Sequence, residues 1–269
     1  MAKRTSQVAG EPVKTKKPQQ AIVDNETLRR LYEIVLGCRT AAERKRDPAV
    51  EGATAQAAAT IELKSDDAIA TSRESVAVEL VRGVSLRAAL AKIETPVNGS
   101  APKLIARAGA GASQLSVAAG VALAQKFDGR NGIVVALTDA ATMSPGAAYD
   151  ALNYASANKL PMIVVLDNMA SAAGVPAPDF TTIAQAHGVP GLLVDRDDAV
   201  AVYRVAREAI NRARTGRGPS LIECRGFESS ESPLRHLEGY LAKHGLWTER
   251  WKRELLARIE RDLRARGAA

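Results

Sequence analysis

The sequence predicts an α/β protein built on a doubly wound parallel sheet, with a helical section before the sheet and a helical arm after it. After residue 104, short continuous apolar runs alternate with amphipathic stretches, which is the order of repeated βαβ units. The apolar runs lack the polar alternation of half-exposed strands, so we expect parallel strands covered by helices on both faces. Before residue 104, only helical periodicity is evident.

The helical section is expected to contain no strand. Its first helix can be capped by Asn25 or Thr27, because either side chain can accept a hydrogen bond from the first helical turn. One apolar stripe follows at helical spacing, formed by Leu28, Leu31, Val35 and Cys38. Further helices are predicted around 52–62, 74–81 and 85–92.

The sheet section repeats one unit. We expect strands at 132–139, 161–168, 191–195 and 219–226, separated by helices at 147–159, 179–188 and 197–215. A small-residue helix at 113–126 precedes the first of these strands. The arm, 233–269, reads as two helices broken at Gly245, with Trp247 and Trp251 four residues apart on one helical face for packing or an interface.

Composition sets the broad class of protein. The chain has 269 residues, 46% of them hydrophobic but only 4% aromatic, so we expect a core of small side chains. No apolar run approaches the about 20 residues that cross a bilayer, and no secretory segment follows the start. Cys38 and Cys224 lack a metal-type spacing, which predicts buried, reduced thiols in a cytoplasmic protein.

Positive charge is concentrated at the start of the chain. The formal net charge is +7, and residues 1–24 supply +3 of it through five basic and two acidic groups. This stretch lacks apolar periodicity, so we expect a disordered, solubilising tail that ends before a domain at 25–232. An acidic partner or nucleic acid remains an alternative ligand of the tail. Nucleic acid is disfavoured because no aromatic residues are interleaved with the charges.

Polar residues stand where two buried strands end. Asp139 closes the strand at 132–139, and Asp167 and Asn168 close the strand at 161–168. Neighbouring strands would bring these ends together at the carboxyl edge of the sheet, where open α/β sheets bind ligands. One carboxylate and one amide oxygen suit Mg²⁺, which completes its shell with phosphate and water. We therefore predict a metal site at Asp139 and Asn168.

The residues after Asp139 allow an anion to approach. Ala140 and Ala141 are small enough to bring a phosphate close to backbone N–H groups at the start of the next helix. A simpler interpretation is that Asp139 only caps the helix at 145–158. Both interpretations stay open at this point.

Five ordered segments carry a resemblance to a known family. They are "LRRLYEIVLGCRTAAER", "LKSDDAIATSRESVAVELVRGVSLRAAL", "QLSVAAGVALAQKF", "DALNYASANKLPMIVVLDN" and "AHGVPGLLVDRDDAVAVYRVAREAINRARTGRGPSLIEC". They lie between Leu28 and Cys224, and the resemblance as a whole covers residues 26 to about 265. The chain resembles the α subunit of the E1 component of thiamine-diphosphate-dependent 2-oxo acid dehydrogenases, of the pyruvate and branched-chain type.

The resemblance implies a thiamine-diphosphate-binding fold and a set of site residues. Asp139 matches the metal-binding Asp of the family, and Arg73 matches the Arg that binds the diphosphate. Asn168 falls on the first Asn of the family's Asn pair, and Gln114 on a Gln that lines the cofactor cleft. The resemblance also implies thiamine diphosphate and Mg²⁺ as cofactors, an E1-β-type partner in a hetero- or homo-oligomer, and an E2 acyltransferase core as a further partner.

Several positions depart from the family pattern. Both glycines beside the metal-binding Asp are replaced, by Thr138 and Ala140, and the second Asn is Met169, whose thioether has no affinity for Mg²⁺. The histidine after the diphosphate-binding Arg is Ser75. The chain also runs from "ECRGFE" directly to "SSESPLRHLEGYL", without the family's long histidine-bearing loop.

The remaining histidines do not restore a proton-transfer group. They lie at a helix end or in the arm and are expected to be surface or packing residues: His187, His236 and His244. We therefore predict an E1-α-like subunit that supports oxidative decarboxylation of a 2-oxo acid with a β partner but is catalytically impaired, with no catalytic residue of its own. The alternative is a non-catalytic pseudoenzyme subunit with an assembly or regulatory role.

Overall fold

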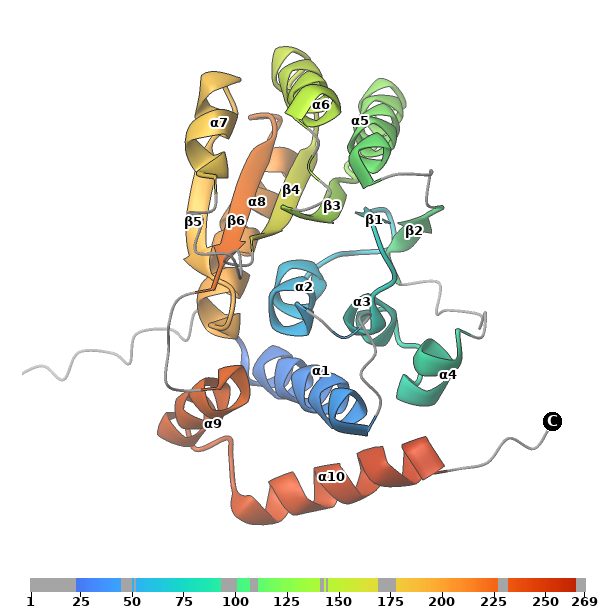
Figure 1. The fold of residues 1–269 in the computed structure, drawn as a ribbon, viewed down its shortest axis with the longest axis vertical. Helices are drawn as coiled ribbons and strands as arrows, with labels where there is room; N and C mark the ends of the chain where they lie inside the picture. Colours follow the sequence, from blue (N-terminus) through green and yellow to red (C-terminus); the bar gives the residue numbers. More distant parts are fainter. Residues whose placement is uncertain are drawn as a thin grey trace, which may run out of the picture.

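The chain alternates helices and strands along most of its length (Figure 1). The computed structural model describes residues 23–44, 50, 52–92, 101–106, 111–140, 143, 145–168, 178–226 and 232–264. The helices are α1 Asn25–Arg44, α2 Ala53–Thr60, α3 Val76–Val81, α4 Leu86–Ala91, α5 Gly111–Phe127, α6 Pro145–Ala157, α7 Phe180–Ala186, α8 Ala199–Arg214, α9 Pro233–Lys243 and α10 Glu249–Arg264. The strands are β1 Ala68–Thr71, β2 Lys103–Ile105, β3 Val134–Asp139, β4 Met162–Asn168, β5 Gly191–Asp195 and β6 Ser220–Arg225.

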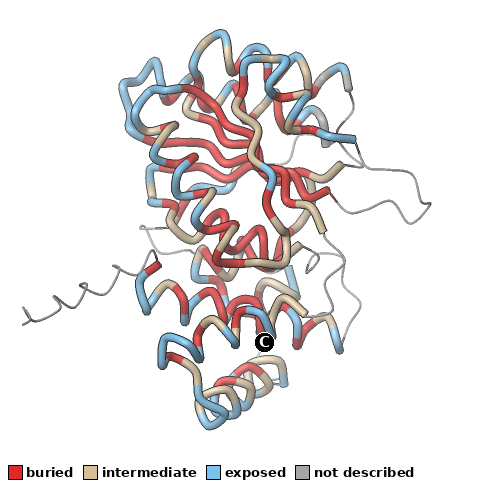
Figure 2. The backbone as a smooth tube through the Cα atoms, turned by 90° about the vertical axis from the view of Figure 1, so that its left-hand side faces the viewer, coloured by how far each residue is buried: buried red, intermediate tan, exposed pale blue. Residues whose placement is uncertain are grey.

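The strands form one six-stranded sheet in the order β2-β1-β3-β4-β6-β5, and every neighbouring pair is parallel. The central strands are buried along almost their whole length, which appears as a red layer in Figure 2. The predicted α/β fold with a doubly wound parallel sheet is confirmed. Each predicted strand and helix of the sheet section lies within two residues of its predicted bounds.

Each face of the sheet is covered by its own set of helices. Val135 and Leu137 of β3 belong to a core cluster shared with α1, α2, α3 and α8. Val134 and Ala136 belong to a second cluster shared with α5, α6 and α7. Because side chains alternate along a strand, odd-numbered residues of β3 and β4 face the first set of helices and even-numbered residues face the second. This alternation also decides which face of the sheet each polar side chain at a strand end lies on.

The section before residue 104 was expected to be wholly helical, and this expectation is wrong. Ala68–Thr71 forms β1, which lies between β2 and β3 and is buried at all four positions. A four-residue apolar strand shows no alternation, so its sequence carries no periodic signal. Long-range bonds hold it instead: buried Asp67 accepts hydrogen bonds from the Ile133 N–H at 3.0 Å and from Nη2 of Arg214 at 2.6 Å.

The start of α1 also differs from expectation. Asp24, rather than Asn25 or Thr27, caps the helix: its carboxylate accepts hydrogen bonds from the Thr27 N–H at 2.8 Å and from Thr27 Oγ1 at 2.7 Å. These bonds lower the pKa of Asp24, because they stabilise its ionised form. Asp is as good a cap as Asn, so the sequence pattern did not distinguish the neighbouring candidates.

The arm consists of α9 and α10, broken at Gly245 with φ of 69°, as predicted. Trp251 packs on Tyr32 of α1 with ring centroids 5.2 Å apart. Trp247 precedes α10, so the prediction that the two tryptophans share one helical face is wrong, although both pack against the core. Among the described residues, no helix combines the length and apolar character needed to span a bilayer. The predicted disordered tail, 1–24, lies almost entirely outside the described residues.

Candidate functional site

Four charged side chains meet at the carboxyl edge of the sheet, and we call them the Asp/Arg cluster: Arg73, Asp139, Asp167 and Arg196. Asp139 and Asp167 are register partners on β3 and β4. Nε of Arg73 lies 3.7 Å from Oδ2 of Asp139, and its Nη2 lies 3.9 Å from Oδ2 of Asp167. Nη2 of Arg196 donates a hydrogen bond of 3.1 Å to Oδ2 of Asp167.

Strand geometry places each member of the cluster. Asp139 and Asp167 share the odd-numbered face of the sheet with Val135 and Val165, and neighbouring parallel strands are about 4.8 Å apart. Arg73 follows the end of β1, and Arg196 follows the end of β5. All four side chains thus come from strand ends, where ligands bind in open parallel sheets.

Asp167 is the most buried member of the cluster. Its side chain is 7% exposed, and burial raises the pKa of its carboxyl group, while Arg196 and Arg73 oppose that rise. Its Oδ1 has no hydrogen-bond partner among the described residues. A buried carboxylate oxygen without a partner is unusual, because the loss of hydration is not repaid by any bond.

The start of α2 closes over this carboxylate. Gly52 precedes the helix with φ of 67°, and a Cβ built on it would lie 2.5 Å from Oδ2 of Asp167. A side chain at this position would therefore meet both backbone strain and a collision. Only glycine allows the helix start to approach Asp167 so closely.

Asn168, the predicted second metal ligand, lies on the other face of the sheet. Its Nδ2 donates to Oε1 of Glu223 at 2.7 Å and to the Pro178 carbonyl at 3.2 Å. Its Oδ1 has no partner in the described part of the chain. The one-residue step from Asp167 to Asn168 reverses the side chain, so the structure does not bring Asn168 to Asp139. Its role as a metal ligand stays a prediction.

The other predicted cofactor contacts have partners within the chain. The Ala140 N–H donates to the Asp167 carbonyl at 3.1 Å, which continues the pairing of β3 with β4. Gln114 is buried near the start of α5, with Nε2 3.4 Å from the Ala106 carbonyl. Ala141 and Met169 lie outside the described residues.

Ser75, which stands where the family has a histidine, caps a helix. Its Oγ accepts from the Val78 N–H at 3.1 Å and donates to Oε1 of Gln56 at 2.5 Å. A small cavity of about 10 Å³ adjoins it, which is about the space of one water molecule. The cavity is lined by Gln56, Thr71, Ser72, Arg73, Ser75, Leu137 and Thr138.

The histidines are engaged elsewhere. His187 ends α7 and lies against Tyr149, with ring centroids 5.3 Å apart. Nδ1 of His236 lies 3.8 Å from Asp198, which caps α8. His244 ends α9 and stacks on Tyr240 of the same helix at 4.4 Å. These ring and ion-pair contacts involve no member of the Asp/Arg cluster, as expected for surface and packing residues.

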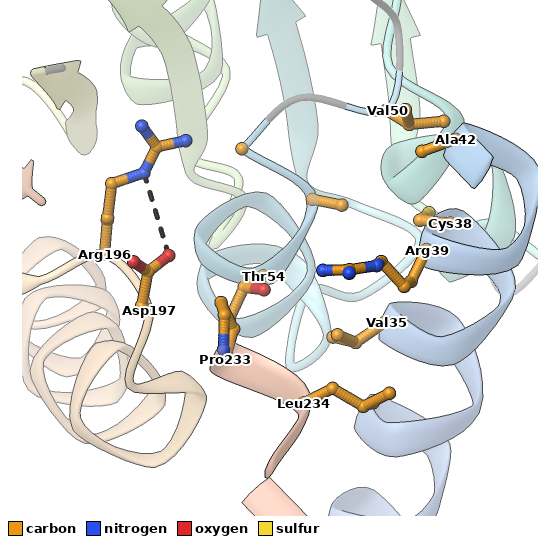
Figure 3. A pocket seen from close by; sticks show the side chains of 12 residues that line it. Val35, Cys38, Arg39, Ala42, Val50, Thr54, Arg196, Asp197, Pro233 and Leu234 are labelled. Atoms are coloured by element: carbon orange, nitrogen blue, oxygen red, sulfur yellow. Dashed lines mark ion pairs between the residues drawn. The ribbon is translucent and has the colours of Figure 1, made fainter. Parts of the chain in front are cut away.

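A larger pocket adjoins the cluster between α1, the start of α2 and the start of α9 (Figure 3). Its volume is about 160 Å³, and Gly52 and Arg196, which both contact Asp167, form part of its wall. Arg39 extends from α1 on the opposite side, and Asp197 lies 4.0 Å from Nε of Arg196. Burial raises the pKa of Asp197.

Sequence reasoning missed Arg196 and gave Asp167 no role. The signal for both was present: "VDRDD" places Arg196 directly after a predicted strand, and "VLDN" places Asp167 at a strand end. The rule that ligands gather at carboxyl ends of parallel strands applies to both residues. Only the fold shows that Arg73, after β1, and Arg196, after β5, come close enough to form ion pairs with Asp167.

The chain is an α/β protein with an all-parallel sheet, and its paired carboxylates and guanidinium groups lie at the carboxyl edge, where open α/β sheets bind their ligands. Residues 47–229 match the family model described as "Dehydrogenase E1 component", and the chain belongs to that family. The predicted resemblance is thereby confirmed.

Named relatives agree with this assignment. The chain is 33% identical over 198 residues to "Pyruvate dehydrogenase E1 component subunit alpha" of Staphylococcus aureus strain Mu50, covering 63% of this chain and 52% of that protein. The subunit of the same name from Staphylococcus epidermidis strain RP62A is 31% identical, with the same coverage. The chain thus spans about half the length of the curated relatives it matches.

A solved structure was also found. It is described as "a putative thiamin diphosphate-dependent enzyme isolated from Mycobacterium smegmatis", with a TM-score of 0.47 and 16% sequence identity. The match covers 67% of this chain and 32% of that chain. The family assignment rests on the family model and not on this likeness.

Proposed function

We propose that the chain is an E1-α-type subunit of a thiamine-diphosphate-dependent 2-oxo acid dehydrogenase, which works with a β-type partner and is catalytically impaired. One observation carries the proposal: a guanidinium, that of Arg73, lies within 4.0 Å of two carboxylates at the carboxyl edge of a parallel sheet. The reaction class is that of the family, and we propose that this cluster binds the diphosphate end of the cofactor together with its metal ion.

The residues of the cluster fit a metal–diphosphate group. Asp139 would hold Mg²⁺ and Arg73 the diphosphate, while Gln114 would line the cleft. No group of three or more His, Cys, Asp or Glu side chains in the described part of the chain is arranged to hold a metal ion. That is compatible with Mg²⁺, which takes one or two carboxylates and completes its shell with phosphate and water. Thiamine diphosphate, when bound, supplies a nucleophilic carbon and an electron sink for decarboxylation.

The departures from the family motif support impaired catalysis. Ala140 carries a Cβ where the family has glycine, and its N–H already pairs with β4. Ser75 is used as a helix cap, so its hydroxyl replaces neither the proton-transfer chemistry nor the reach of a histidine. Loss of a general acid or base lowers the rate by about 10²–10⁴-fold.

A partner follows from the proposed class. The relatives are named as α subunits of an E1 component, which favours a β-type chain that completes the site. The surface of α5 offers a contact region, because Gly120 and Ala124 are exposed and Phe127 at its end is 81% exposed. Phenylalanine is enriched at protein interfaces, so we propose this face of α5 as the contact region. An E2 acyltransferase core is the further partner that this class would have.

The test is affinity capture of the tagged chain from its own cells, followed by assays of the chain alone and of the recovered complex. We expect a β-type chain to be recovered and the complex to bind thiamine diphosphate with Mg²⁺. The chain alone should release no CO₂ from pyruvate, and the complex should release it slowly. A chain that stays monomeric in light scattering and captures no β-type chain would refute the proposal.

The pseudoenzyme alternative has its own outcome in this test. A complex that forms but neither binds thiamine diphosphate nor releases CO₂ would assign the chain an assembly or regulatory role. The capping role of Ser75 and the commitment of the Ala140 N–H to β4 are the observations that favour this alternative.

A further inference from the structure

We propose that Asp167 is a second carboxylate ligand for the divalent cation, and that Arg196 is a second guanidinium for the diphosphate. With Asp139 and Arg73 they would form a site that takes metal and diphosphate only together. The inference rests on the cofactor class of the proposed function, but not on catalysis or on a partner.

The position of Asp167 suits a ligand shared with Asp139. The two residues are register partners on neighbouring parallel strands, and their side chains leave the same face of the sheet. The Oδ2 atoms of both carboxylates lie within 4.0 Å of the guanidinium of Arg73, which leaves Oδ1 of Asp167 free of this contact. Met169 offers no oxygen to Mg²⁺, whereas Asp167 offers a carboxylate.

An unsatisfied atom points to a ligand. Oδ1 of Asp167 is buried without a hydrogen-bond partner among the described residues, while Oδ2 is bonded to Arg196. A buried carboxylate oxygen normally accepts at least one bond. A cation bound at Oδ1 would satisfy it without disturbing the bond to Arg196.

The charges of the cluster explain why neither ion should bind alone. The two carboxylates and two guanidiniums of the cluster carry no net charge together, and Asp197, 4.0 Å from Nε of Arg196, is more exposed to solvent than either aspartate of the cluster. A cation alone would meet the two guanidiniums, and a diphosphate alone would meet the two carboxylates, so attraction and repulsion nearly cancel. A metal–diphosphate pair carries both positive and negative charge, so the cation can lie next to the carboxylates and the diphosphate next to the guanidiniums. Arg196 matters here because it contributes the second positive charge at 14% side-chain exposure.

The experiment measures binding to the full chain by calorimetry and thermal unfolding, with Mg²⁺ alone, inorganic pyrophosphate alone, and both together. We expect binding only when both are present. Asp167→Ala should weaken pyrophosphate binding in the presence of Mg²⁺ at least about tenfold, the change expected for losing a charged ligand. Asp167→Asn keeps one oxygen but loses the charge, so its affinity for pyrophosphate with Mg²⁺ should fall between that of the original chain and that of Asp167→Ala.

Controls separate a ligand from a structural role. Asp150→Asn, on the exposed surface of α6, should leave binding unchanged. Mn²⁺ in place of Mg²⁺ allows the bound ion to be observed by electron paramagnetic resonance, and its signal in the presence of pyrophosphate should change in Asp167→Asn. A folded Asp167→Ala variant is recognised by an unchanged circular dichroism spectrum, and if it does not fold, the Asn variant decides.

Two results would overturn the inference. One is an affinity within twofold of the original chain in Asp167→Asn and Asp167→Ala, while Asp139→Ala loses binding. The other is tight binding of either ion alone, or no binding of the pair. If binding depends on Asp167 but no β-type chain is captured, the proposed function fails and this inference stands. If a β-type complex binds thiamine diphosphate independently of Asp167, the reverse holds.

Discussion

Two buried carboxylates lie near the end of β4 on opposite faces of the sheet, and they are bonded very differently. Glu223 is fully buried, and both of its oxygens accept hydrogen bonds: Oε1 from Asn168 at 2.7 Å and Oε2 from the Thr181 N–H at 3.1 Å. Arg225 adds a charge-assisted bond of 2.5 Å to Oε1. Asp167 has one such bond, from Arg196, and an oxygen with none among the described residues.

The comparison distinguishes a structural network from an open one. A carboxylate with every oxygen bonded stabilises the packing around it, and removing it leaves several donors unsatisfied. A carboxylate with an unsatisfied oxygen contributes less to folding and is available to a ligand. The two networks are separated by a single residue step along β4, since Asn168 joins one and Asp167 the other.

The largest expected effect on stability comes from removing Glu223, the carboxylate whose two oxygens are both bonded; we call its bonds the closed network and those of Asp167 the open network. Glu223→Ala should lower the free energy of unfolding by about 3–5 kcal/mol, because it leaves Arg225 without its buried partner and takes from the Asn168 amide and the Thr181 N–H a carboxylate acceptor each. Urea unfolding of the two chains measures this loss. A loss below 1 kcal/mol would mean that the network is not what holds α7 and β6 together.

Gly52→Ala should have the next largest effect on stability, because Gly52 lies against Asp167 in the open network. The new Cβ meets Oδ2 of Asp167 at 2.5 Å and adds a strained φ of 67°. Gly129→Ala is the matched control, because it has a φ of 64° but nothing within 4 Å. We expect a loss of about 1 kcal/mol for the control and at least about 2 kcal/mol for Gly52→Ala in thermal unfolding. Equal losses would show that α2 does not press on Asp167.

Asp167→Asn should change stability less than the loss of Glu223 does. It removes an ion pair with Arg196 but also the cost of keeping a charge buried, so we expect a change of about 1 kcal/mol or less. Urea unfolding beside Glu223→Gln gives a direct comparison of the two carboxylates. A larger loss for Asp167→Asn than for Glu223→Gln would reverse the distinction between the open and the closed network.

The smallest effect is a pH dependence at the edge of the closed network. Asp179 caps α7, and hydrogen bonds from Thr181 and Thr182 lower the pKa of its carboxyl group to about 2. The ionised form is therefore favoured in the folded state, and its stabilisation is present above the ordinary pKa of 3.8 and lost as the pH falls towards 2. The difference in urea midpoint between the original chain and Asp179→Ala should shrink over this range. A constant difference would argue against this role of the cap.

The elements of the fold could be predicted from sequence because each has a local signal. The strands 162–168 and 220–225 are apolar runs of the right length, and α8 has an amphipathic pattern with Asp198 as its cap. Asp139 could be selected because it stands at a strand end. β1 could not be predicted, since its four buried residues show no period and Asp67 holds it through contacts with Ile133 and Arg214.

The sequence by itself determined the family, the alternation of strands and helices, and the presence of acidic residues at the carboxyl edge, because motifs and periods are properties of neighbouring residues. The tertiary structure decided which acidic residues matter. Asp167 and Asn168 differ by one position, yet strand alternation sends one to Arg73 and Arg196 and the other to Glu223. Those partners lie 29 or more residues away along the chain, and their approach depends on strand order, which no local pattern encodes.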